Sequence, residues 1–265
     1  IDQPSTCHRP TIDLPPTCHR RAIDLPPHLP ARPPQDPGRY AIFGSGPRDL
    51  PHGIDTILYT ADGGSRVDMF DIVNDPRHDL LLPGATAACA ARIRAHEWEV
   101  VGLAMVCTSW SRVKWPAVRH AQELWGLPDP PAMVGTLTGR EYLDYHNALS
   151  RAFLALLDAC IDASVDFWFE NPADATPEYI DGVANRFHDR RAGSAASIFR
   201  TREWQDAEAR ARATMGGAFV LLVQCPLGAL GLKPTAFFAT GRVAASLAPL
   251  AWLRCVCIGP HVGAA

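Results

Sequence analysis

From residue 39 onward, short apolar runs alternate with longer segments in which apolar residues recur at helical spacing. The short runs predict β-strands at residues 40–43, 66–73, 78–82, 99–106, 165–169, 219–224 and 236–239. Helices are predicted at residues 85–96, 141–164 and 202–214. The long middle helix has its apolar side chains on one face, namely Tyr142, Leu149, Phe153, Leu156, Leu157 and Cys160.

This alternation of strands and helices favours an α/β fold, with a doubly wound, mostly parallel sheet that helices cover on both faces. The last two strands follow one another without a helix, so we expect them to form an antiparallel edge. In open parallel sheets, ligands bind beyond the carboxyl ends of the strands. Residues that directly follow a predicted strand are therefore the first candidates for a functional site.

Residues 1–38 have a different composition from the rest of the chain. Ile-Asp-x-Pro begins at residues 1, 12 and 23, Thr-Cys-His-Arg begins at residues 6 and 17, and many prolines follow. Proline lacks the backbone donor that helices and sheet interiors need, so we predict a disordered or polyproline-like tail at 1–38 and one domain at 39–265.

Two sets of cysteines and histidines raise the question of a metal. The Cys-His pairs of the N-terminal repeats fit either zinc binding or a passive tandem duplication, and Cys255, Cys257 and His261 supply only three candidate ligands. Neither set has the spacing of a structural zinc site. We therefore expect no metal site.

Composition narrows the class of protein. The chain has 265 residues, of which 47% are hydrophobic and 20% charged, as in globular proteins. No apolar run is long enough to cross a bilayer, and the N-terminus lacks the apolar segment of a secretory signal. Cys89 and Cys160 lie in predicted helices, where free thiols are common. We expect an intracellular protein of the nucleus or cytoplasm, not secreted and without a membrane partner.

The net charge of −3 means that the chain as a whole does not attract nucleic acid. Any such binding would need a local basic patch, and residues 186–212, which carry more arginines than acids, are one candidate. The same arginines also fit an ordinary solvated helix face.

A candidate cofactor pocket follows the first two strands. Phe43 is followed by Gly44-Ser45-Gly46, where glycines let the backbone approach a ligand closely. Asp71 lies near the end of the second strand, where nucleotide-binding α/β folds place an acid that accepts ribose hydroxyls. A loop glycine pair and a capping acid are the structural alternative.

A candidate chemical pocket follows two later strands. Cys107 ends the most apolar strand, with Ser109, Ser111 and Arg112 nearby as donors that could favour a thiolate. Glu170 ends a strand rich in Phe and Trp. A small buried thiol and a capping acid are the alternatives for these two residues.

In their order along the chain, these motifs resemble the cytosine-5 DNA methyltransferases, most closely a divergent, shortened branch without a separate target-recognition domain. The segments that carry the resemblance are Phe43-Gly44-Ser45-Gly46, Asp71, Cys107-Thr108-Ser109-Trp110-Ser111, His146-Asn147, Glu170-Asn171-Pro172, Cys225-Pro226-Leu227-Gly228 and Lys233-Pro234-Thr235. The resemblance spans about residues 40–260.

The resemblance implies a methyltransferase-type fold, S-adenosylmethionine as cofactor and nucleic acid, DNA rather than RNA, as partner. It implies that Phe43, Gly44 and Gly46 border the cofactor and that Asp71 holds its ribose. It also implies that Cys107 adds to the cytosine ring while Glu170 binds the ring nitrogen and amino group. The residues implied at the substrate are Ser109, Ser111, Arg112, Asn171, Pro172, Lys233 and Thr235.

Two other functions stay open at this point. The chain could be a catalytically inactive relative that binds nucleic acid or a protein, with the proline-rich tail as a docking segment. It could also be a cysteine hydrolase that pairs Cys107 with a histidine such as His146. The target sequence and the oligomeric state are left open.

Overall fold

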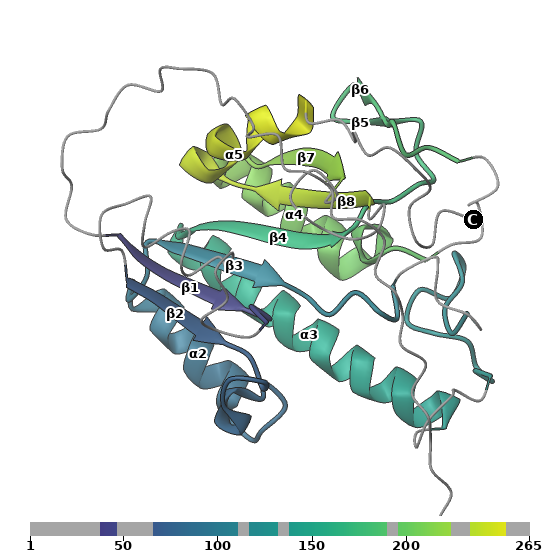
Figure 1. Cartoon of the computed structure of the whole chain (residues 1–265), viewed down its shortest axis with the longest axis horizontal. Helices are drawn as coiled ribbons and strands as arrows, with labels where there is room; N and C mark the ends of the chain where they lie inside the picture. Colours follow the sequence, from purple (N-terminus) through teal and green to yellow (C-terminus); the bar gives the residue numbers. More distant parts are fainter. Residues whose placement is uncertain are drawn as a thin grey trace, which may run out of the picture.

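A six-stranded mixed sheet forms the centre of the computed structural model (Figure 1), which describes residues 38–46, 66–110, 117–131, 138–189, 196–223 and 234–252. The strands are β1 (Arg39–Phe43), β2 (Arg66–Phe70), β3 (Val100–Ala104), β4 (Asp166–Pro172), β7 (Ala218–Val223) and β8 (Pro234–Ala239). Their order across the sheet is β2-β1-β3-β4-β8-β7. β2, β1, β3 and β4 are parallel, and β8 runs antiparallel to both β4 and β7. The prediction of an α/β fold with a mostly parallel sheet is confirmed.

The described helices cover both faces of this sheet. α2 (Ala85–Arg94), α3 (Gly139–Ala163) and α4 (Arg202–Met215) lie on one face, and α5 (Gly241–Leu247) lies on the other (Figure 1). On the first face, Phe169 of β4 packs against Trp204 of α4, with ring centroids 4.6 Å apart. On the second face, Arg242 of α5 forms an ion pair with Asp166, whose side chain alternates with that of Phe167.

α3 is held at its start by a capping box. The Thr138 hydroxyl accepts a hydrogen bond from the Glu141 backbone N–H, and the Glu141 carboxylate accepts one from the Thr138 backbone N–H. Ser164, in the left-handed region at φ 54°, ends the helix. The apolar face predicted for this segment is buried in the core, including Leu149, Phe153 and Leu157. Burial of these side chains therefore holds the later turns of α3 against the core.

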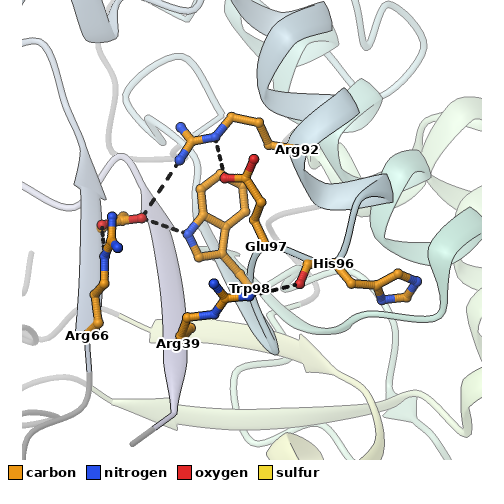
Figure 2. Close-up of polar contacts among 7 residues, drawn as sticks. Arg39, Arg66, Arg92, His96, Glu97 and Trp98 are labelled. Atoms are coloured by element: carbon orange, nitrogen blue, oxygen red, sulfur yellow. Dashed lines mark hydrogen bonds and ion pairs between the residues drawn. The ribbon is translucent and has the colours of Figure 1, made fainter.

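A polar network joins β2 to α2 and to the residues before β3 (Figure 2). The Trp98 indole N–H donates to the Asp68 carboxylate at 2.9 Å, and Arg92 stacks over Trp98 at 4.4 Å while pairing with Glu97. Arg66, at the amino end of β2, pairs with Asp68 and is largely exposed. This network satisfies the polar atoms that flank an otherwise apolar contact between α2 and the sheet.

The short strand predicted at residues 78–82 is wrong. Residues Pro76–His78 form a short 3-10 helix that begins at Asp75, whose carboxylate accepts a hydrogen bond from the Arg77 backbone N–H. Asp79 then accepts from the Leu81 backbone N–H and closes another turn. The local hydrogen bonds of two aspartates and the fixed φ of Pro76 therefore override the apolar residues at 80–82.

Some elements of the observed fold were not predicted from the sequence. These are α5, the following 3-10 turn Ala248–Trp252, the 3-10 turn Ile198–Arg200 and a small antiparallel hairpin of β5 (Tyr179–Ile180) and β6 (Val183–Ala184). The antiparallel pairing of β7 with β8 is confirmed, although β8 lies inside the sheet, between β4 and the edge strand β7. The tail predicted at residues 1–38 lies almost entirely outside the described residues.

No helix in the described part of the chain has the length and apolar character needed to cross a membrane.

Candidate active site

Four of the predicted site residues lie at or just beyond the carboxyl ends of the parallel strands. The chain passes from β1 to β2 on one side and later to β3 on the other, so the strand order reverses at β1. Such a reversal leaves a crevice beyond the carboxyl ends of the two strands that flank it. Gly44 follows β1, Asp71 follows β2, and Cys107 lies three residues after the end of β3. Glu170 lies in β4, directly beside Ala104 at the end of β3.

The loop after β1 is shaped by its two glycines. Gly44 has φ +71°, and a Cβ on it would lie 2.1 Å from the backbone oxygen of Ala104 at the end of β3. Its N–H donates to the Phe70 carbonyl at the end of β2. Gly46 has φ +74°, yet a Cβ there would meet no atom of the described residues within 4 Å. Gly44 is thus needed for close packing between strand ends, while Gly46 makes no such contact within the described part of the chain.

Asp71 connects the second strand to this glycine loop. One carboxylate oxygen accepts a hydrogen bond from the Gly46 N–H at 2.9 Å, and the other accepts from the Val73 N–H at 3.0 Å. The Asn74 side chain donates to the Gly46 carbonyl at 2.8 Å. The structure therefore joins Asp71 and Gly46, which are 25 residues apart in sequence, in one loop cluster. Each carboxylate oxygen keeps lone pairs for a further donor.

Cys107 is partly exposed on the loop that leaves β3. Met105 before it is buried in the core, Val106 is exposed, and the Cys107 carbonyl accepts a hydrogen bond from the Trp110 N–H. Glu170 is buried, and its position in β4 puts its side chain on the sheet face of Trp168 rather than that of Phe169. A partly exposed cysteine therefore follows one strand, and a buried glutamate belongs to the next strand.

The N-terminal part of α3 extends beyond the carboxyl ends of β1 and β3 and lines the same side of the molecule (Figure 1). Burial raises the pKa of Tyr142, and the nearby Cys107 raises it further, while Arg119 opposes both effects. Burial also raises the pKa of Tyr145, with added contributions from Asp79 and Asp71. His146 packs its ring against Tyr142, with centroids 4.3 Å apart. These tyrosines carry no local motif and were missed from the sequence.

A buried arginine lies behind the loop of Cys107. Arg119 donates to the Ser109 hydroxyl at 3.1 Å and to the Leu124 carbonyl at 2.9 Å, and its guanidinium stacks 3.9 Å from the Trp110 ring. Burial lowers its pKa to about 10, and the charge of Arg151 contributes to this decrease. The Trp110 indole in turn donates to the Ser150 hydroxyl of α3. The loop after Cys107 is thus tied to α3 through a buried polar layer.

The remaining predicted residues fall into three groups. Phe43 is fully buried and stacks on Phe70, so its ring is part of the core and only its backbone lies near the glycine loop. Asn171, Pro172 and Thr235 lie where β4 pairs with β8. Thr235 is buried. Asn171 is also buried, and its side-chain nitrogen has no hydrogen-bond partner among the described residues. Outside the described residues are Ser111, Arg112, Lys233, the segment 225–228 and the candidate metal ligands Cys7, His8, Cys18, His19, Cys255, Cys257 and His261.

The cluster at the strand ends has features that fit a nucleoside cofactor. No described residue lies within 4 Å of the place that a Cβ on Gly46 would take, and the Asp71 carboxylate supplies acceptors next to this glycine. No bulky side chain occupies the turn, because its residues are Gly44, Ser45 and Gly46. Comparison with protein-family models and with curated proteins finds no match.

Proposed function

We propose that this protein transfers a methyl group from S-adenosylmethionine to cytosine in nucleic acid, DNA rather than RNA, through a covalent adduct with Cys107. The observation that carries the proposal is the shared position of the glycine loop, Asp71, Cys107 and Glu170 at the carboxyl edge of the sheet. The doubly wound, methyltransferase-type fold is part of the same proposal. The four parallel neighbouring strands and the helices on both faces support it.

In this proposal the cofactor lies against the loop after β1. Gly44 keeps the end of β1 packed against the end of β3, Gly46 leaves the loop without a side chain beside the cofactor, and Asp71 accepts hydrogen bonds from ribose hydroxyls. When bound, S-adenosylmethionine supplies an activated methyl group. Tyr145 of α3 lies close enough to Asp71 for the charge of this carboxylate to raise its pKa.

Cys107 and Glu170 then act on the base. As a thiolate, the Cys107 sulfur adds to the cytosine ring at the carbon next to the one that is methylated, which makes the ring electron-rich. Glu170 holds the ring nitrogen and the amino group and stabilises the charge that develops there. After the transfer, the methylated carbon would lose its proton and the Cys107 thiolate would leave, which would restore the cytosine ring, with the demethylated cofactor as the other product. A base in a duplex is stacked and out of reach, so the target must be flipped out or come from a single strand. The partial exposure of Cys107 is compatible with such a substrate.

Two observations favour the alternative of a catalytically inactive relative. Both Asp71 carboxylate oxygens already accept hydrogen bonds within their own loops. Met105 and Val106 precede Cys107, whereas the family that this chain resembles has two prolines there, and prolines restrict the backbone of the nucleophile loop. In this alternative, the fold binds nucleic acid or a protein without transferring methyl groups.

The proposal is tested by methyl transfer from labelled S-adenosylmethionine to cytosine-containing DNA. We expect transfer by the wild-type protein and none by Cys107→Ser, because the hydroxyl is a far weaker nucleophile than a thiolate. Cys89→Ser is the matched control, since Cys89 lies on α2 as a half-buried free thiol, and this variant should keep wild-type activity. Equal transfer by Cys107→Ser and wild type would rule out the covalent mechanism.

A further inference from the structure

Two arginines and two tryptophans form a cluster between the Cys107 loop and α3, which we call the Arg-Trp cluster. It consists of Trp110, Arg119, Trp125 and Arg151. The two indole rings meet edge to face, with centroids 5.7 Å apart. Arg119 lies over the Trp110 ring, and Arg151 lies over the Trp125 ring at 4.8 Å. The cluster thus presents two guanidinium groups on a rigid aromatic support.

The positive charge of this cluster is not neutralised within the described part of the protein. No described carboxylate forms an ion pair with Arg119 or Arg151; the carboxylate attached to the cluster, Glu203, instead accepts a hydrogen bond from the Trp125 indole at 3.3 Å. Arg119 is only 4% exposed, yet its hydrogen bonds go to a neutral hydroxyl and a neutral carbonyl. A buried charge without a counter-ion is costly, so such an arrangement points to an anionic partner.

Arg119 also keeps unused donors. Its Nε is buried and has no hydrogen-bond partner, although a guanidinium has five N–H donors and the two contacts made here use two of them. Arg151 is exposed on α3, and its guanidinium lies over Trp125, whose ring contacts that of Trp110. Burial lowers the pKa of Arg119 to about 10, and the charge of Arg151 contributes to this decrease, so Arg119 remains protonated at neutral pH.

We infer that the Arg-Trp cluster binds backbone phosphates of the nucleic-acid substrate, next to the base that enters the site of Cys107. This inference rests on the proposed function and assigns to it a contact region for the substrate. Arginine suits the role because its planar fork of donors matches the oxygens of a phosphate. Arg119 also holds Ser109, two residues after Cys107, so phosphate binding and the position of the nucleophile loop involve the same side chain.

The test uses the salt dependence of binding to a fluorescein-labelled 20-base-pair duplex and to its cytosine-containing single strand, without cofactor. Each phosphate contact contributes about 0.9 to the slope of log K against log salt on duplex DNA, and about 0.7 on a single strand. We expect Arg151→Gln, which removes the exposed guanidinium, to lower the slope by about one contact and to weaken binding equally for all sequences. Arg119→Gln removes the buried charge of the cluster and should also weaken binding equally for all sequences. Arg119→Lys should keep the slope but bind less tightly, because it keeps the charge and loses the fork.

Arg66→Gln is the matched control, since Arg66 is an exposed arginine at the amino edge of the sheet, and its slope should equal that of the wild type. If Arg119→Gln does not fold, the exposed Arg151→Gln and the charge-conserving Arg119→Lys still decide the question. The inference is overturned if the folded variants match Arg66→Gln, or if the wild type binds neither oligonucleotide. Methyl transfer with unchanged slopes would overturn this inference alone, whereas changed slopes without transfer would leave it standing and remove the proposed function.

Discussion

At the residue scale, the end of β1 shows most clearly how the strand ends depend on single side chains. Gly44 and Gly46 have almost the same backbone conformation, with φ values of +71° and +74°, but their surroundings differ. A side chain at Gly44 would collide with the end of β3, whereas a Cβ at Gly46 would contact none of the residues that the structure describes. The pair therefore separates the cost of the backbone conformation from the cost of a steric clash.

We predict that Gly44→Ala destabilises the protein more than Gly46→Ala does. A left-handed conformation costs an alanine about 1–2 kcal/mol at either position. Only Gly44→Ala adds the contact at 2.1 Å with the Ala104 backbone, which can be relieved only by shifting β1 away from β3. Urea unfolding of both variants measures the difference, and equal free energies of unfolding would contradict the described packing of these strand ends.

The sequence indicated the residues whose chemistry is local and missed those that come together only in the fold. Gly44, Asp71 and Cys107 each follow a predicted strand, so their position at one edge could be derived from the alternation of strands and helices. Arg119 lies in an irregular segment between elements, and its burial depends on Trp110 and Ser109. In the sequence, the feature that marks this region is the alternation of Trp and Arg from residue 110 to 125, and this pattern does not predict a buried charge.

At the scale of elements, α3 carries more of the candidate site than any other helix. Its N-terminal part carries Tyr142 and His146, and its later turns carry Ser150 and Arg151 of the layer behind the Cys107 loop. These residues keep their positions only if the first turns of the helix are formed. The capping box at Thr138 and Glu141 therefore stabilises the site as well as the helix.

We predict that Thr138→Ala lowers the free energy of unfolding by about 1 kcal/mol, because the Glu141 backbone N–H loses its acceptor. Thr138→Ser keeps the hydroxyl and should lose much less. Thermal unfolding followed by circular dichroism gives both values. A loss in Thr138→Ser as large as that in Thr138→Ala would show that packing of the threonine methyl group, and not capping, is responsible.

Elements were predicted well where burial decides the structure and poorly where local hydrogen bonds decide it. The periodic apolar face of α3 predicted a helix, and the continuous apolar run of β3 predicted a buried strand. The segment at residues 78–82 was wrong because Asp75 and Asp79 use their carboxylates to close turns. α5 was missed because this short helix has no buried side chain and thus no apolar periodicity to read.

At the scale of the whole molecule, the order of strands determines which strand ends lie together at the edge on which the proposed function depends. The alternating pattern predicted parallel strands, but it could not predict that β1 lies between β2 and β3, or that β8 is inserted between β4 and β7. These neighbours are chosen by long-range packing, such as that of Trp168 over Gly102 across β4 and β3. Once this order is set, the glycine loop and Cys107 necessarily share one edge.

Binding of S-adenosylmethionine, measured as a shift in thermal unfolding, tests most directly whether this edge is a cofactor site. At a concentration of 100 times the dissociation constant, a ligand that binds only the folded protein stabilises it by about 2.7 kcal/mol. We predict a clear rise in the unfolding temperature of the wild type and a smaller rise in Asp71→Asn. The control Asp162→Asn, at the far end of α3, should respond like the wild type. No shift in a folded wild-type protein would contradict the cofactor site and favour an inactive relative.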